Sequence, residues 1–241
     1  MPAHPAMPAI TVDQMREVDR LVVEVYGTGL VQMMEHAGRN LAELARILLG
    51  GAVAGKSVLI AAGKGNNGGG GLVAARHLSN WGAVVTALIE SSAALRDVPL
   101  LQWRALHRLP ARREEGSAAL ETMSHAQTDL VIDALVGYGL DAAPRGWIAK
   151  MIGRINTQAA PVLALDVPSG LDATTGAAYT PCVKATTTMT LALPKTGLLV
   201  PVAQPYVGML YLADIGVPPV LYAHLGLDVE VIFAQESIIQ L

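Results

Sequence analysis

The feature that most constrains the fold is a buried strand that passes through a glycine-rich segment directly into a helix. Residues 57–62, SVLIAA, form a short apolar run of the kind that a strand buried on both faces needs. Residues 71–81 then show helical spacing, with small and aliphatic side chains on one face and polar ones on another. This succession predicts the opening of a parallel α/β sheet.

Six glycines surround the pair Asn66-Asn67 between that strand and that helix. Without Cβ atoms, the segment can adopt positive φ and bring its amides close to a ligand. It also lies at a helix N-terminus, where unpaired N–H groups and the helix dipole favour an anion such as a phosphate. The alternative is a merely flexible turn, but a dispensable turn rarely needs so many glycines at such a junction. The six are Gly63, Gly65, Gly68, Gly69, Gly70 and Gly71.

Length and composition suit one α/β domain. The chain has 241 residues, of which 52% are apolar but only 4% aromatic, so the core must be built from aliphatic side chains and Met. No apolar run reaches the roughly 18–20 residues that span a bilayer. A net charge of −3 argues against nucleic acid or an anionic membrane as a partner. Cys182 is the only cysteine, which excludes an internal disulfide and a thiolate metal cluster.

The first ten residues, MPAHPAMPAI, lack the basic and apolar regions of a signal peptide. We expect residues 1–10 to be a disordered tail and residues 11–241 to form one domain. The chain contains no internal repeats or linkers. The sequence therefore predicts a cytoplasmic protein with a single domain.

Predicted strands and helices alternate along most of the chain. Expected helices cover 11–26, 30–49, 71–81, 98–107, 118–125 and 144–156. Expected strands cover 57–62, 84–89, 109–113, 130–135, 161–165, 185–193, 207–213 and 228–233. An antiparallel orientation is considered for the strand over 207–213, and the alternation in 228–233 is typical of an edge strand. We therefore expect a three-layer, doubly wound, mostly parallel sheet of the Rossmann-like class, with two extra N-terminal helices.

Polar side chains gather where the predicted strands end. Right-handed crossovers place the carboxyl ends of parallel strands at one edge of a sheet, and ligands bind there. A single Asp at a strand end is often only an acceptor that orders a loop, but the shared placement of several polar residues indicates a common site. They are Asn66, Asn67, Asp133, Asp166, Ser169 and Lys195.

Residues 63–68, GKGNNG, also satisfy the dinucleotide fingerprint G-x-G-x-x-G, and Glu90 lies about the right distance beyond it. An NAD-dependent oxidoreductase is therefore an alternative. The further glycines argue against this alternative. The two Asn side chains also argue against it, because they add oxygen acceptors, which phosphate binding does not need. A P-loop NTPase is excluded, since no lysine precedes Ser or Thr in this loop, and the scattered histidines give little support to a zinc site.

Several segments together resemble one family. Residues 63–78, GKGNNGGGGLVAARHL, resemble the GPGNNGGDGLVAARHL signature of the NAD(P)H-hydrate epimerases, the YjeF N-terminal domain family. Other segments resemble the family patterns QMR..D, MEnAGR, DALFGtGL,.DIPSGwD and.APKpGLL…yvGel.vaDIGvP. These segments are residues 13–19, 34–39, 133–140, 165–172, 192–199 and 206–217. The resemblance covers roughly residues 11–219 in the family's order.

The resemblance implies an isomerase of metabolite repair that binds a monovalent cation. The expected ion is potassium, one per subunit, held by Asn67, Asp133 and Ser169. Oxygen ligands suit such a hard cation. The implied reaction interconverts the R and S hydrates of NADH and NADPH (NADHX and NADPHX) at C6 of the nicotinamide ring. Substrate contacts map to Asn66, Asn67, Gly68, Gly69, Gly70, Gly137, Tyr138, Gly139, Leu140, Asp141, Ala142, Ala143 and Asp166.

Asp166 is our candidate for the acid–base group that assists departure and return of the C6 hydroxyl. Lys195 is a second candidate, which would orient or charge that site. The resemblance also implies a homodimer, for which the N-terminal helices are a candidate contact. It further implies a separate NAD(P)H-hydrate dehydratase, which acts on the S form, because this chain is too short to carry one.

One position departs from the family pattern. Where the family has Asp in GGDG this chain has Gly70, and Gly71 preserves the spacing. We expect the family's acid to cap the helix, worth about 1 kcal/mol, and to help order the site. If that acid also contacts the ligand, activity is lowered or lost. The chain would then be a non-catalytic nucleotide-binding or scaffold module, as in decapping-scaffold relatives of this domain, but retention of the other expected site residues favours an enzyme.

Overall fold

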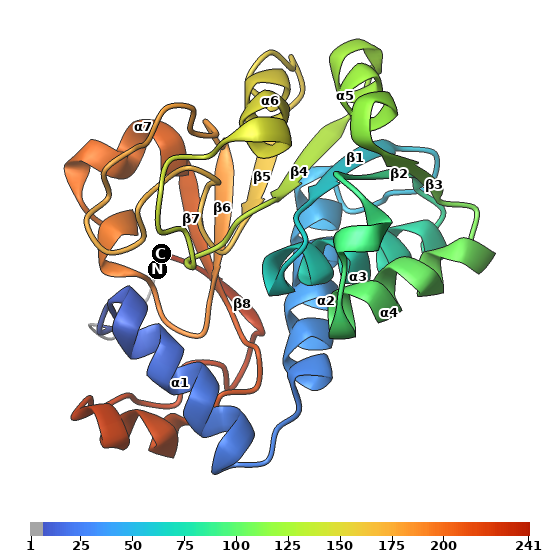
Figure 1. The fold of residues 1–241 in the computed structure, drawn as a ribbon. Helices are drawn as coiled ribbons and strands as arrows, with labels where there is room; N and C mark the ends of the chain where they lie inside the picture. The colour runs from blue at the N-terminus through green and yellow to red at the C-terminus, as the bar shows by residue number, and fades with distance from the viewer. Residues whose placement is uncertain (1–6) are drawn as a thin grey trace.

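The computed structural model describes residues 7–241 as one sheet with helices on both faces (Figure 1). Its strands are β1 (Ser57–Ala62), β2 (Val84–Ile89), β3 (Arg112–Glu115), β4 (Leu130–Ala134), β5 (Val162–Leu165), β6 (Thr187–Leu191), β7 (Met209–Ala213) and β8 (Ile238–Gln240). Its α-helices are α1 (Val12–Glu24), α2 (Leu30–Leu48), α3 (Asn66–Asn80), α4 (Asp97–Ala105), α5 (Gly116–His125), α6 (Gly146–Ile155) and α7 (Gln204–Val207). None of the described helices is long and apolar enough to cross a membrane.

The strand order is β3-β2-β1-β4-β5-β6-β7-β8. Strands β1 to β7 run parallel, and β8 pairs antiparallel with β7. The chain builds outward from β1 in one direction and from β4 in the other, so the topological switch point lies between β1 and β4. The predicted doubly wound, mostly parallel fold is confirmed. The antiparallel orientation considered for β7 is wrong, because β7 pairs parallel with β6. The antiparallel strand of the sheet is β8.

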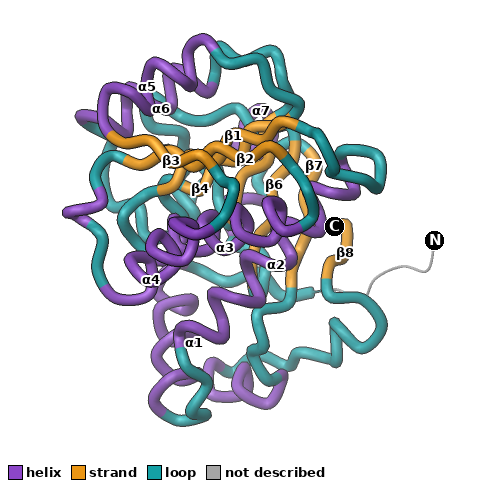
Figure 2. The backbone as a smooth tube through the Cα atoms, turned by 90° about the vertical axis from the view of Figure 1, so that its right-hand side faces the viewer, coloured by secondary structure: helices purple, strands orange, loops and turns teal. Residues whose placement is uncertain are grey.

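Two helical layers enclose the sheet (Figures 1 and 2). Helices α2, α3 and α4 pack on one face, where Ile60 of β1 is buried. Helices α5 and α6 pack on the other face, where its neighbour Leu59 is buried, as alternation along a strand requires. Helix α1 lies apart from both layers and packs on the segment after β7, including Leu221 and Tyr222. One of the two predicted extra helices therefore belongs to a layer, and the other covers the end of the sheet.

Two expectations for the chain ends need correction. Ile10 is wholly buried, and its N–H donates to the carbonyl of Pro194 at 2.9 Å. The disordered tail expected over 1–10 therefore does not extend to Ile10, while residues 1–6 lie outside the described part of the chain. Residues 228–233 form no strand, so the predicted edge strand is wrong. None of these residues is buried, Glu230 and Val231 are exposed in succession, and β8 already occupies the edge beside β7.

The glycines of the β1–α3 junction do not adopt the backbone conformation considered for them. Helix α3 begins at Asn66, five residues earlier than expected, and none of the six glycines has a positive φ. The expectation of positive φ is wrong. A Cβ on Gly63 would lie 1.8 Å from the carbonyl oxygen of Leu135, and one on Gly71 would lie 2.5 Å from the Cβ of Ala134. These glycines therefore let the start of α3 approach β4 and the segment after it.

Helices α2 and α3 cross at another glycine, which gives a testable prediction. A Cβ on Gly38 would lie 2.3 Å from the Cβ of Val73 and 2.5 Å from the carbonyl oxygen of Gly70. We expect Gly38→Ala to lower the free energy of unfolding in urea by about 1–3 kcal/mol, because the helices must move apart. Gly153 in α6 has open space around it, so Gly153→Ala should raise that free energy by about 0.5–1 kcal/mol. Equal effects at the two sites would contradict the prediction.

Candidate functional site

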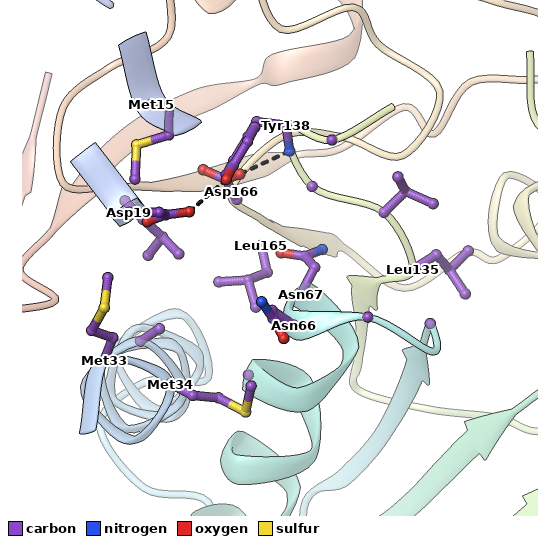
Figure 3. A pocket seen from close by; sticks show the side chains of 18 of the residues that line it. Met15, Asp19, Met33, Met34, Asn66, Asn67, Leu135, Tyr138, Leu165 and Asp166 are labelled. Carbon is purple, nitrogen blue, oxygen red and sulfur yellow. Dashed lines mark hydrogen bonds between the residues drawn. The ribbon is translucent and has the colours of Figure 1, made fainter. Parts of the chain in front are cut away.

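A cavity of about 690 Å³ opens at the carboxyl ends of β1, β4 and β5, beside the switch point (Figure 3). Its walls come from α1, α2, the start of α3 and the segments that follow the strands. Methionine and aliphatic side chains of α1 and α2 line one side. A mostly apolar cleft with a few convergent polar groups is typical of a small-molecule site. The polar lining residues are Arg16, Asp19, Lys64, Asn66, Asn67, Glu90, Tyr138, Asp166 and Lys195.

Asp166 and Lys195 form a buried ion pair in this cavity. The Nζ of Lys195 donates to Oδ1 of Asp166 at 2.6 Å, to the carbonyl of Leu191 at 2.8 Å and to the hydroxyl of Thr190 at 3.4 Å. All three ammonium donors therefore have acceptors, and the Lys195 side chain is fully enclosed. Asp166 has a φ of +68°, a conformation that non-glycine residues rarely adopt and that is concentrated at functional positions.

Tyr138 connects Asp166 to helix α1. Its backbone N–H donates to Oδ2 of Asp166 at 2.9 Å, and its hydroxyl donates to Oδ2 of Asp19. Burial raises the pKa of Tyr138 well above its usual range, and the negative charge of Asp19 raises it further. Burial likewise raises the pKa of Asp19, against the opposing effect of the Tyr138 hydrogen bond. The phenol therefore stays protonated and donates to the carboxylate.

Asp133 and Ser169 bind each other at the ends of β4 and β5. Oδ2 of Asp133 accepts the Ser169 N–H at 2.8 Å, and Oδ1 accepts the Ser169 hydroxyl at 2.7 Å. Burial raises the pKa of the Asp133 carboxyl to about 6, although the hydrogen bonds from Ser169 oppose this. Within residues 7–241, Asp133 is wholly buried and forms no ion pair. The end of β4 therefore holds an acidic group that has no cationic side chain beside it among the described residues, and neither Asp133 nor Ser169 is among the residues that line the cavity.

Asn67 lies beside Asp166 across Gly137 (Figure 3). A Cβ on Gly137 would lie 2.9 Å from Oδ2 of Asp166 and 3.0 Å from Oδ1 of Asn67. The Nδ2 of Asn67 is buried and has no hydrogen-bond partner in the described part of the chain. Turning the amide by 180° would present its oxygen at that unpaired position instead. An orphaned buried amide of this kind calls for a further binding partner.

A family model described as YjeF-related protein N-terminus matches residues 30–197, well over half of the chain. This chain belongs to the YjeF-related N-terminal family. The resemblance inferred from the sequence motifs is confirmed.

Named relatives and a solved structure agree with this family. The NAD(P)H-hydrate epimerase of Dehalogenimonas lykanthroporepellens is 46% identical over 92% of this chain and 87% of its own length. The bifunctional NAD(P)H-hydrate repair enzyme Nnr of Moorella thermoacetica is 39% identical over 89% of this chain, which spans only 41% of that protein. The crystal structure of the yeast protein ynu0 superposes with a TM-score of 0.82, covering 98% of this chain and 100% of the yeast chain. At 22% identity, this last similarity shows the fold alone.

The cavity brings together part of the substrate-binding set expected from the YjeF-related family. Those that line it are Asn66, Asn67, Gly70, Gly137, Tyr138, Gly139 and Asp166. The remaining members are not among the described residues of its lining: Gly68, Gly69, Leu140, Asp141, Ala142 and Ala143. Gly69 packs instead against Met34, and Asp141 and Ala142 are exposed. A role for these six in substrate binding stays a prediction.

Gly70, where the family has an acid, is the fifth residue of α3 and is buried. The helix has Gly65 as its N-cap, so an acid at position 70 lies too far along the helix to cap it. The capping role expected for that acid is wrong. A Cβ at Gly70 would lie 2.9 Å from Cδ2 of Leu165, and both residues line the cavity. An acid here would therefore stand at the cavity wall.

The N-terminal helices contribute to the cavity, which was not predicted from the sequence. They were expected to cover the core or to form a dimer contact, whereas Asp19 of α1 and Met33 of α2 line the cavity. The family pattern QMR..D, which ends at Asp19, was the available signal. Glu90, considered only for the dinucleotide fingerprint, also lines the cavity at the end of β2.

Proposed function

We propose that this chain is an NAD(P)H-hydrate epimerase that interconverts the R and S forms of NADHX and NADPHX. The observation that carries the proposal is the buried Asp166–Lys195 pair in a cavity that also holds the N-terminus of α3. A proton-transferring carboxylate beside an anion-binding helix end suits a reaction on a dinucleotide. The names of the family relatives from Dehalogenimonas lykanthroporepellens and Rhodopirellula baltica support the same activity.

Each wall of the cavity has a role in this reaction. The amides at the start of α3, around Asn66, bind the pyrophosphate, because unpaired helix N–H groups and the helix dipole favour anions. The apolar side formed by residues such as Met33 and Leu165 packs on the nicotinamide ring and excludes water. These contacts hold C6 of the ring within reach of Asp166.

Asp166 exchanges a proton with the C6 oxygen on its own face of the ring, donating one to a departing hydroxyl or accepting one from an arriving water. Lys195 occupies Oδ1 of Asp166, so that Oδ2, which also accepts the Tyr138 N–H, is the oxygen beside Asn67 and Gly137. Lys195 therefore acts as a positioning residue that fixes the carboxylate. Its own three donors are engaged, which leaves none for the substrate.

The residues around Asp133 fit a potassium ion. Its buried carboxylate has no cationic partner in residues 7–241, and a bound cation would offset the burial that raises its pKa to about 6. Asn67, once its amide is turned so that the oxygen replaces the unpaired Nδ2, and the hydroxyl of Ser169 would add oxygen ligands of the type that hard cations prefer. When bound, the ion supplies a positive charge beside the substrate pocket. We assign one potassium ion per subunit to Asn67, Asp133 and Ser169.

Potassium should therefore stabilise the fold. We expect potassium chloride, but not choline chloride at equal ionic strength, to raise the thermal unfolding midpoint, by an amount that corresponds to roughly 2.7 kcal/mol at one hundred times Kd. Asn67→Ala should abolish this shift at little cost to the fold, because its Nδ2 makes no described hydrogen bond. Asn66→Ala, one residue away, should keep the shift. An undiminished potassium effect in Asn67→Ala would contradict the assignment.

Gly137→Ala tests the close approach of the loop to the site. The added methyl would meet Oδ2 of Asp166 at 2.9 Å and Oδ1 of Asn67 at 3.0 Å, so one of them must move. We expect kcat/KM for epimerisation to fall about 100-fold, since a displacement near 1 Å at a reacting group costs that much. Gly153→Ala, in open space on α6, is the control and should leave kcat/KM unchanged. An active Gly137→Ala enzyme would place the reaction elsewhere.

The activity itself is tested with the R hydrate and an S-specific dehydratase, with and without potassium. Purified chain should consume the R hydrate faster than an enzyme-free control. If only Gly70→Asp does so, the natural chain is a non-catalytic module of the same fold. If the chain instead oxidises NADH with a small carbonyl compound, the oxidoreductase alternative holds.

The same proposal extends to partners and location. A dehydratase downstream consumes the S hydrate; the relative from Moorella thermoacetica is named as a bifunctional repair enzyme. Two copies of this chain form a homodimer in the cytoplasm, and α1 is the candidate contact, since its Val23 and the C-cap residue Val25 are exposed. Size measurement in solution tests the dimer.

A further inference from the structure

A second carboxylate, Asp19, faces the cavity from helix α1 (Figure 3). Its Oδ2 accepts the hydroxyl of Tyr138, whose backbone N–H donates to Oδ2 of Asp166 at 2.9 Å. The two carboxylates are thus held at opposite ends of one tyrosine, and both line the same cavity. Asp19 is half-buried and forms no ion pair with any described residue, whereas Asp166 is tied to Lys195.

Epimerisation at C6 needs proton transfer on both faces of the nicotinamide ring, and one carboxylate cannot serve both. The hydroxyl leaves from one face of the nicotinamide ring and a water oxygen arrives on the other. Asp166 can exchange a proton with the oxygen on its own face, but the ring lies between it and the oxygen on the opposite face. A proton-transferring group must lie within hydrogen-bond reach of the atom it serves. The reaction therefore needs a second such group across the ring.

We propose that Asp19 is the catalytic acid–base group for the second face of the ring, with Asp166 serving the first. This assignment rests on the proposed epimerase function. Tyr138 is a positioning residue, because its hydroxyl orients the Asp19 carboxylate and its N–H orients that of Asp166.

The step balances without an oxidant or reductant. A protonated carboxyl on one face gives its proton to the hydroxyl, the C6–O bond breaks with its electron pair going to oxygen, and water leaves. The lone pair of ring N1 forms the N1=C6 double bond of a cation. Water then adds on the opposite face, the π pair returns to N1, and the second carboxylate takes the proton. Exchange with solvent resets the two carboxyl groups.

The surroundings of Asp19 suit this role. It sits among apolar side chains such as Met15 and Met33, and burial raises the pKa of its carboxyl. Its acceptor oxygen is oriented by a hydroxyl that stays protonated. A carboxylate needed only for packing would gain nothing from a position on the cavity wall.

The test follows oxygen exchange in each epimer separately. Purified R and S hydrates are incubated in H₂¹⁸O, separated by chromatography and weighed by mass spectrometry. Wild-type chain should label both epimers. Asp19→Asn should keep exchange with retention in one epimer and slow it about 10²- to 10⁴-fold in the other. Asp166→Asn should show the opposite selectivity, because each variant keeps one of the two faces.

Controls separate this role from a structural one. Glu17→Gln makes the same charge change on the exposed side of α1 and should leave both exchange rates unchanged. Tyr138→Phe keeps both carboxylates and should slow the epimer that Asp19→Asn affects, which provides a second variant if Asp19→Asn does not fold.

The assignment is overturned if the Asp19→Asn variant exchanges the C6 oxygen of both epimers at wild-type rates. It is also overturned if this variant folds but exchanges the oxygen of neither epimer. If Asp19→Asn does not fold, a Tyr138→Phe that slows both epimers equally or neither overturns it as well. A wild-type chain that does not epimerise at all overturns the proposed function and this assignment with it.

Discussion

Asp166→Asn should lower the rate of hydrate epimerisation by about 10²- to 10⁴-fold while the chain keeps its fold. The amide oxygen of Asn can still accept the Lys195 ammonium, which also keeps its bond to the Leu191 carbonyl at 2.8 Å. It can neither give a proton to a hydroxyl that leaves from its face of the ring nor take one from a water that arrives there. Because Lys195 loses its counter-charge, the unfolding midpoint should also fall, so the rates must be measured well below it.

A matched control makes this loss specific. Asp228→Asn makes the same chemical change at an exposed position on the segment before β8 and should leave the rate unaltered. Circular dichroism and cation-dependent unfolding report whether the Asp166→Asn chain is folded. Unchanged turnover in Asp166→Asn would remove Asp166 from the mechanism.

The sheet could be predicted because the apolar sequences of its inner strands indicate that these strands are buried. Strands β1, β4 and β5 are short apolar runs, and such runs are typical of parallel strands covered on both faces. The outer edge could not be predicted in the same way. Alternation looks the same in a parallel strand, an antiparallel strand and an extended loop, and β8 has only three residues.

The meeting of Asp166 and Lys195 also followed from topology, because both come after strands of one parallel sheet. The place of Asp19 did not follow. It is 119 residues from Tyr138, and α1 is held at the cavity by packing on α2 and on the segments after β6 and β7. Such long-range packing leaves no local periodicity to detect. The number of glycines at the β1–α3 junction likewise did not show whether they were needed for positive φ or for close contact between a helix and a strand, because that contact is also long-range.

The burial of Lys195 leads to the second large effect. Lys195→Met should lower the free energy of unfolding in urea by about 3–5 kcal/mol, because it leaves the Asp166 carboxylate buried without its partner. Both side chains are almost fully enclosed, with exposed fractions of 0% and 5%, so water replaces the lost ammonium poorly. Lys56→Met, at an exposed ion pair with Asp129, is the control and should change this free energy by at most about 1 kcal/mol.

The double variant Asp166→Asn with Lys195→Met separates charge pairing from packing. The double variant removes both buried charges. Its loss of unfolding free energy should therefore be smaller than the sum of the losses in the two single variants, by a coupling energy of about 0.5–3 kcal/mol. It should nevertheless remain as inactive as Asp166→Asn, since the carboxylate that moves the proton is gone. Additive losses would mean that the 2.6 Å contact contributes nothing to folding, and the role of Lys195 in fixing the carboxylate would fall with it.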